Sequence, residues 1–323
     1  MIFTNVALDE AEGLILAHST GTTSGMLRKG RTLTVEDVAA LRSTGHTAVT
    51  CARLEAGDVD ENAAASRIAT MLSGTNVRAG KAATGRADLY AEAAGLVILD
   101  AATLIALNRI DEALTIATLK PLDRVAAGEV IATIKIIPFA LPEHAIGAAA
   151  DICAVVPPPV AVRPFQRKSA GLILTKLPHT KSSILTKRQR VTQERLEAIG
   201  SSLAASEVVD HDEQAVAGAI QRMVQSKLDP ILIFAASATV DRRDVIPAAL
   251  NRVGGEVEQI GMPAEPGNQI MVGRLGHRDV IGLPGCAGSP KLNGFDWVLE
   301  RRLAGIQVRR NEITELSIGG LLR

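Results

Sequence analysis

Aromatic side chains are scarce in this sequence: Phe, Trp and Tyr together make up 2% of its 323 residues. The hydrophobic content is nevertheless 47%, so an ordered globular core must be built from Ala, Val, Ile and Leu. The scarcity argues against a nucleic-acid partner, because single strands are bound on aromatic stacking platforms. A net charge is also missing, since 35 basic residues balance 35 acidic ones, and this argues against a general nucleic-acid or membrane-surface binder.

Cysteine is rare too. Cys51, Cys153 and Cys286 are far apart and have no metal-ligand spacing, which fits a reducing compartment. No run approaches the roughly 20 apolar residues of a membrane span, and no N-terminal segment resembles a signal peptide. These absences predict a soluble cytoplasmic protein without a membrane partner.

What the sequence does have is a set of small-residue turns in its last third. One follows the apolar run 230–234 and includes Ala236, Ser237 and Thr239, and another follows the run 279–281. Each predicts a strand, a turn and a helix, in which small side chains let a ligand approach the backbone N–H groups. With a third turn at Pro266-Gly267 between them, they predict an anion or phosphate pocket along one edge of an α/β sheet.

The order of these motifs resembles the molybdopterin-binding domain of molybdenum-cofactor biosynthesis proteins, a group that includes the bacterial molybdenum insertases and gephyrin. The resemblance rests on a turn ending in Asp244, then Gly254-Gly255-Glu256, Pro266-Gly267, and Gly282-Leu283-Pro284-Gly285 followed by Ser289. It covers residues 165–323, and residues 10–60 loosely. It implies an α/β C-terminal domain of three layers with a mostly parallel sheet, which binds molybdopterin or its adenylylated form.

The turns and the resemblance together predict the ligand contacts of this domain. They are Ala236, Ser237, Thr239, Asp241, Pro266, Gly267, Pro284, Gly285, Ser289 and Lys176. Asp244 stands where the family has an Asp that can hold a pterin amino group or hydrated Mg²⁺, so it is the candidate catalytic residue and metal ligand. Asp210 is a second candidate for Mg²⁺. A helix-capping role is the alternative for Asp244.

Lys176 replaces an acidic Gly-Asp-Glu turn that related domains usually carry at this place. It belongs to a basic stretch in which a single acid, Glu194, accompanies nine basic residues: Arg163, Arg167, Lys168, Lys176, Lys181, Lys187, Arg188, Arg190 and Arg195. Such an excess calls for an anionic partner, or forms a solvated basic face.

Three prolines at 157–159 stiffen the chain and place a domain junction near residues 156–166. We therefore expect a smaller α+β N-terminal region over residues 1–160, with a small β unit near 111–139, and the molybdopterin-binding-like domain over 161–323. In the N-terminal region Thr34 and Asp37 predict the capped start of a helix over 35–43, followed by a strand over 46–54. The basic, Gly-containing segment 78–88 is either a phosphate-binding loop or a solvated connector. A closing strand is expected over residues 305–316.

These features favour a molybdenum-cofactor biosynthesis protein. It would act in metal insertion, hydrolysing adenylylated molybdopterin with Mg²⁺ while placing molybdate, or in hand-over of the cofactor to a nucleotidyltransferase or an apo-molybdoenzyme. The alternatives are a non-enzymatic carrier or scaffold, and a nucleotide-binding α/β protein outside this pathway. Relatives commonly form oligomers, so a homo-oligomer is expected.

Overall fold

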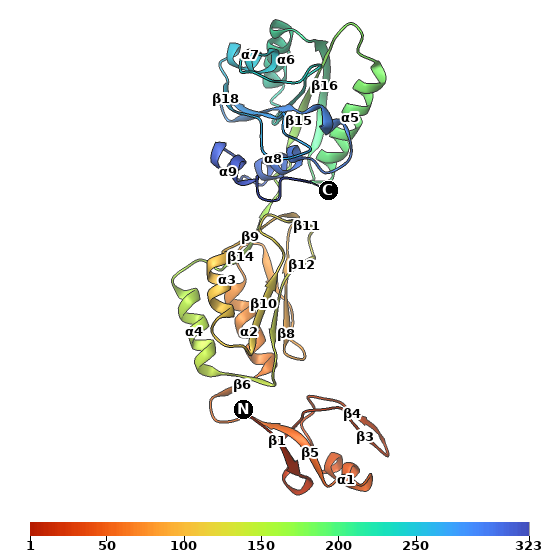
Figure 1. Ribbon diagram of the computed structural model, residues 1–323, viewed down its shortest axis with the longest axis vertical. Coiled ribbons are helices and arrows are strands. Elements are labelled where there is room, and N and C mark those ends of the chain that lie inside the picture. Colours follow the sequence, from red (N-terminus) through yellow and green to blue (C-terminus); the bar gives the residue numbers. More distant parts are fainter. Residues whose placement is uncertain (323) are drawn as a thin grey trace. The chain divides into compact units, whose positions relative to one another are not determined.

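The computed structural model describes residues 1–322, and the chain divides into two compact units, Met1–Arg163 and the part that begins at Pro164 (Figure 1). Within the described part of the chain, no helix combines the length and the apolar character needed to cross a membrane.

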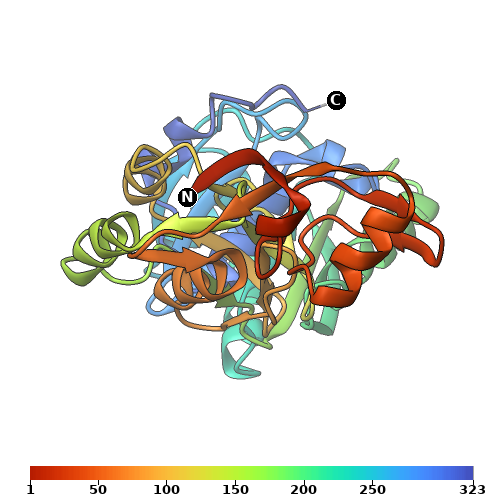
Figure 2. The ribbon, with the colours of Figure 1, turned by 90° about the horizontal axis from the view of Figure 1, so that it is seen from below.

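The first unit opens with a small three-stranded antiparallel sheet in the order β1-β5-β2. Figure 2 shows this segment in red and orange, and its α1 helix contacts the β3–β4 hairpin. The predicted capping box of α1 is confirmed: Thr34 Oγ1 accepts from Asp37 N, and the Asp37 carboxylate accepts from Thr34 N. The elements are β1 (Ile2–Ala7), η1 (Leu8–Glu10), β2 (Ile15–Leu16), β3 (Thr20–Thr22), β4 (Gly25–Leu27), α1 (Val35–Ser43) and β5 (Ala48–Arg53).

The rest of the first unit is built around a four-stranded antiparallel sheet in the order β10-β12-β8-β7, with α2 packed on β8 and β12. Its core is aliphatic, with Ile68, Leu72, Leu89 and Ile134 almost fully buried. The elements are β6 (Asp58–Asp60), α2 (Glu61–Leu72), β7 (Val77–Ala79), β8 (Arg86–Ala91), β9 (Gly95–Leu99), α3 (Ala101–Asn108), β10 (Leu114–Thr118), β11 (Arg124–Val125), β12 (Val130–Ile136), β13 (Ala140–Pro142), α4 (Glu143–Ala154) and β14 (Val160–Pro164). In the segment 78–88, residues 78–79 and 86–88 belong to the paired strands β7 and β8, and residues 80–85 connect them.

The second unit has a six-stranded sheet in the order β16-β15-β17-β20-β19-β18. The first four strands are parallel to one another, and β19 and β18 run antiparallel at one edge. The elements are β15 (Ser169–Lys176), α5 (Ser182–Glu197), β16 (Ser202–Asp210), α6 (Glu213–Gln225), β17 (Ile231–Phe234), α7 (Val245–Arg252), β18 (Glu256–Ile260), β19 (Met271–Leu275), β20 (Arg278–Leu283), η2 (Gly285–Gly288), α8 (Gly294–Leu303) and α9 (Arg310–Glu315).

Alternate side chains of the central strands build two cores, one on each face of this sheet. Leu232 and Phe234 of β17 pack with residues of α5 and α8, whereas Ile231 and Ile233 pack with residues of α6 and α7. This alternation follows from the two-residue period of a strand. The three-layer α/β fold with a mostly parallel sheet, predicted for this part of the chain, is confirmed.

The predicted closing strand over residues 305–316 is wrong, because residues 310–315 form helix α9. The Glu312 side chain accepts a hydrogen bond from Arg309 N at 2.8 Å, which satisfies a free N–H at the start of the helix. Val308 and Ile313 supply the buried contacts.

Candidate functional site

The turns that follow β17 and β20 meet around one cavity of about 190 Å³. We call it the inner cavity, and its lining consists of Arg188, Ala235, Ala236, Ser237, Ala238, Thr239, Gln269, Leu283, Pro284 and Gly285. The turns meet because β17 and β20 are adjacent parallel strands whose last residues, Phe234 and Leu283, are paired in register. Ligands of open α/β sheets bind in such crevices beyond the carboxyl ends of the strands.

Thr175, the buried residue before the end of β15, holds the first turn in place. Its hydroxyl accepts a hydrogen bond from Ala236 N at 2.6 Å and donates to the carbonyl of Phe234 at 3.1 Å. The same oxygen lies 3.0 Å from His211 Nδ1. Because the single hydroxyl proton is used by Phe234, the ring nitrogen of His211 is the donor in this contact. The turn is thus tied to β15 and to the end of β16.

Arg188 of α5 brings a positive charge to the wall of the inner cavity. Its guanidinium lies 4.8 Å from the centroid of the Phe234 ring, and Nη1 is 3.4 Å from the carbonyl oxygen of Ala235. Burial lowers the pKa of Arg188, but a guanidinium keeps its proton in proteins. A partly desolvated cation beside the backbone of this turn is suited to an anionic or π-rich ligand.

A second hollow of about 280 Å³ adjoins the inner cavity and shares Arg188 and Gly285 with it. This outer groove is lined by Ile184, Lys187, Arg188, Gly285, Cys286, Gly288 and Ser289. None of the described residues that line the two hollows is acidic, whereas Lys187 and Arg188 are cationic. The site therefore has the electrostatic character of an anion-binding site.

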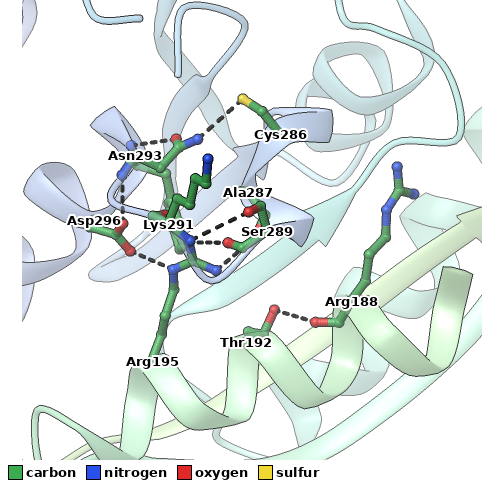
Figure 3. A network of polar contacts seen from close by, with 10 residues as sticks. Arg188, Thr192, Arg195, Cys286, Ala287, Ser289, Lys291, Asn293 and Asp296 are labelled. Atoms are coloured by element: carbon green, nitrogen blue, oxygen red, sulfur yellow. Dashed lines mark hydrogen bonds and ion pairs between the residues drawn. The ribbon is translucent and has the colours of Figure 1, made fainter. Parts of the chain in front are cut away.

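Arg195, two turns after Arg188 on α5, fixes the floor of the groove (Figure 3). Its Nε lies 2.6 Å from Asp296 Oδ1, and its terminal nitrogens donate to the carbonyls of Ala287, Ser289 and Lys291 at 2.7 to 3.0 Å. The ion pair is mostly buried, with side-chain exposures of 12% and 14%. Arg195 is a positioning residue, since it holds the η2 turn against α5 without lining either hollow.

The structure brings six of the predicted contact residues into the two hollows. Ala236, Ser237, Thr239, Pro284 and Gly285 line the inner cavity, and Ser289 lines the outer groove. Whether they bind a ligand stays a prediction.

The remaining predicted contacts lie outside the two hollows. Pro266 accepts a hydrogen bond from Gly294 N at 2.8 Å. A Cβ on Gly267, whose φ is +133°, would come within 2.7 Å of the same nitrogen, so this turn packs on the start of α8. Asp241 forms a solvent-exposed pair with Arg243 at 2.7 Å.

Lys176 and Asp210 line a separate pocket of about 450 Å³ at the ends of β15 and β16, together with His211. Lys176 Nζ is 3.6 Å from Asp210 Oδ1, and both side chains are largely exposed. Asp244 is the N-cap of α7: its Oδ1 accepts from Val245 N and its Oδ2 accepts from Val240 N. Its catalytic and metal-binding roles stay predictions. The described residues contain no cluster of three His, Cys, Asp or Glu side chains suited to a metal ion.

Sequence reasoning missed Arg188 and Gln269 as individual lining residues. Arg188 was only one of nine basic residues in its stretch, but a signal was present. Arg188, Thr192 and Arg195 are spaced by four and three residues, so they share one face of a helix. That face is turned toward the two turns.

The fold and the site define an α/β domain that offers backbone-rich turns and a cation to an anionic ligand. Residues 180–304 match a family model described as "Probable molybdopterin binding domain". The resemblance predicted from the motifs is confirmed, because the matched residues all lie in the second unit and include both turns of the inner cavity. Residues 5–53 match a family described only as a domain of unknown function.

The solved structures similar to this chain include two molybdopterin biosynthesis proteins. A molybdopterin biosynthesis MoeA protein from Pyrococcus horikosii is 11% identical, with a TM-score of 0.34 over 94% of this chain and 75% of that one. A molybdopterin biosynthesis Mog protein from Mycobacterium ulcerans is 20% identical, with a TM-score of 0.29 over 42% of this chain and 92% of that one. A search of curated proteins finds no significant match.

Proposed function

We propose that the inner cavity and the outer groove bind molybdopterin or its adenylylated form, and that the protein hands this cofactor over to a nucleotidyltransferase or an apo-molybdoenzyme. The observation that carries the proposal is the meeting of the two small-residue turns with Arg188 in a single cavity, inside the region that matches the family model.

Each part of the site suits one part of such a ligand. The ligand phosphate would pair with Arg188 and Lys187, because charge-assisted hydrogen bonds to phosphate are strong. The heterocycle has several N–H donors and ring acceptors, which the backbone of residues 235–239 and the amide of Gln269 can satisfy. Small side chains in both turns leave room for the ligand to reach these backbone groups.

Hand-over is favoured above metal insertion by the arrangement of carboxylates. Insertion with Mg²⁺ needs oxygen ligands that converge on the ion. Both oxygens of Asp244 already accept backbone hydrogen bonds, and Asp210 lies in a different pocket beside Lys176. The absence of a carboxylate from the described lining of the inner cavity and the outer groove supports hand-over.

Retention of molybdopterin by the purified protein is the test. After incubation and gel filtration, we expect the pterin to co-elute with the protein, as it does with a known insertase run in parallel; light scattering on the same peak would give the oligomeric state. With adenylylated molybdopterin and Mg²⁺, we expect binding without release of AMP. Release of AMP would indicate metal insertion and not hand-over. Failure to retain the pterin would overturn the proposal. Binding of ATP or GTP equal to that of molybdopterin would favour a nucleotide-binding protein outside the pathway.

A further inference from the structure

A third hollow, of about 420 Å³, lies entirely within the first unit and belongs to none of the sites above. We call it the lysine cavity; it is lined by Lys29, Gly30, Glu61, Asn62, Thr84, Lys135, Ile137 and Phe139. These residues come from several separate segments: the loop after β4, the start of α2, the tip of the β7–β8 hairpin, β12 and the loop before β13. Its volume lies in the range of about 300 to 1,000 Å³ that is typical of small-molecule sites.

Hydrogen-bond donors outnumber acceptors in this cavity. Lys29 Nζ lies over the Phe139 ring at 5.4 Å from the centroid. Lys135 Nζ donates one of its three N–H bonds to the carbonyl of Thr84 at 2.5 Å. Asn62 uses its amide oxygen to accept from Gly85 N, which leaves the amide NH₂ for another partner. A ligand that satisfies this wall must carry several acceptor oxygens.

Glu61 supplies the only carboxylate of the lining, and no hydrogen bond from the described residues reaches it. Its Oε2 and Lys135 Nζ both crowd Gly85: a Cβ there would lie 2.7 Å from the first atom and 2.9 Å from the second. Gly85 also has a φ of +69°, which a glycine adopts without strain. The hairpin tip can thus approach both charged groups closely. The carboxylate is left to accept from an O–H or N–H of a ligand.

We propose that the lysine cavity binds a small phosphate ester, whose phosphate is held by Lys29 and Lys135, whose organic part lies against Phe139 and Ile137, and which donates a hydrogen bond to Glu61. A phosphate monoester matches the surplus of donors, because its three terminal oxygens offer more acceptor sites than a carboxylate. The cavity is larger than free phosphate requires, and its apolar side is formed by Phe139, which is 7% exposed, and by the exposed Ile137.

The electrostatics of Glu61 agree with this assignment. Burial raises the pKa of Glu61, while the charges of Lys135 and Lys29 act in the opposite direction and neighbouring Asp60 raises the pKa further. The folded state therefore disfavours the ionised form of Glu61, and a hydrogen bond donated by the ligand would offset this cost.

The test is calorimetric titration of the full chain with inorganic phosphate and with phenyl phosphate. We expect phenyl phosphate to bind more tightly than inorganic phosphate, because its ring gains contact with Ile137 and Phe139. Lys29→Met and Lys135→Met should each weaken binding by about tenfold or more, the effect of a lost hydrogen bond to a charged group. Lys120→Met is the matched control, since Lys120 is an exposed lysine of the same unit outside the cavity, and it should bind as the wild type does.

Two further variants separate a binding role from a structural one. Glu61→Gln should bind inorganic phosphate and phenyl phosphate more tightly, because neither probe has an organic donor for Glu61 and the substitution removes a negative charge from the cavity. Weaker binding by this variant would contradict the placement of the phosphate beside Glu61. Arg188→Met should leave unchanged the component of binding that Lys29→Met and Lys135→Met weaken, which distinguishes the lysine cavity from the inner cavity of the second unit. Absence of binding at millimolar phenyl phosphate, or binding indifferent to Lys29→Met and Lys135→Met, would overturn the proposal. Molybdopterin retention plays no part in either outcome.

Discussion

The hydroxyl oxygen of Thr175 lies 2.6 Å from the backbone nitrogen of Ala236, so the end of β15 holds the turn that follows the neighbouring strand β17. Thr175→Val should destabilise the second unit by roughly 1–3 kcal/mol, because Ala236 N–H and the Phe234 carbonyl would lose their partner in a buried position. Urea unfolding would measure this loss in the free energy of unfolding. Thr175→Ser, which keeps the hydroxyl, should lose less stability than Thr175→Val. A Val variant as stable as the wild type would show that water or backbone movement replaces these bonds.

Arg188 should matter for ligand binding more than for stability. Arg188→Met keeps an unbranched side chain of similar length against Phe234 but removes the guanidinium, and we expect molybdopterin to bind at least about tenfold more weakly. Equilibrium titration of pterin fluorescence would measure this change. Arg190→Met is the matched control on the same helix: Arg190 is exposed, pairs with Glu194 four residues on and does not line the cavity, so it should bind normally. Equal effects of the two substitutions would exclude a specific role for Arg188.

Asp244 can be tested for capping and for chemistry with a pair of substitutions. Asp244→Ala removes the N-cap of α7 and should cost about 1–2 kcal/mol of unfolding free energy, whereas Asp244→Asn keeps a good capping side chain and should cost little. We expect Asp244→Asn to retain molybdopterin as the wild type does. Loss of a Mg²⁺-dependent AMP release in a fully stable Asp244→Asn protein would instead assign the carboxylate to catalysis.

The pH dependence of the free energy of unfolding should report the unfavourable burial of the Glu61 carboxylate. Its raised pKa means that the folded chain holds this proton more tightly than the unfolded chain, so ionisation favours unfolding. Glu61→Gln should therefore match the wild type in stability below the ordinary pKa of 4.5. The variant should become more stable than the wild type as pH rises through the folded-state pKa.

Denaturant unfolding at several pH values between about 4 and 7 would follow this difference. Glu112→Gln, at an exposed glutamate of the same unit, should show no such trend. A Glu61→Gln variant less stable than the wild type at neutral pH would contradict the assignment of strain to this carboxylate.

Features set by neighbouring residues could be predicted from the sequence. The capping box of Thr34 and Asp37 and the strand–turn–helix order around residues 230–253 depend on local hydrogen bonds and on the period of apolar residues. The closing strand expected over residues 305–316 was wrong because Glu312 accepts a hydrogen bond from Arg309 N and stabilises the start of a helix there. Residues far apart in sequence, such as Lys29 and Lys135, meet only through tertiary packing, and nothing in their own segments indicated a shared cavity.

Arg188 and Arg195 are carried by the same helix, one in the wall of the inner cavity and the other clamping the turn beneath the groove. Their separation of seven residues is about two helical turns, so both side chains point to the same side of α5. Adding or deleting one residue anywhere between them would swing one guanidinium by about 100° around the helix axis. Such a change would turn either Arg188 away from the inner cavity or Arg195 away from η2. Insertions and deletions between these two residues should therefore be far less tolerated than changes of side chain.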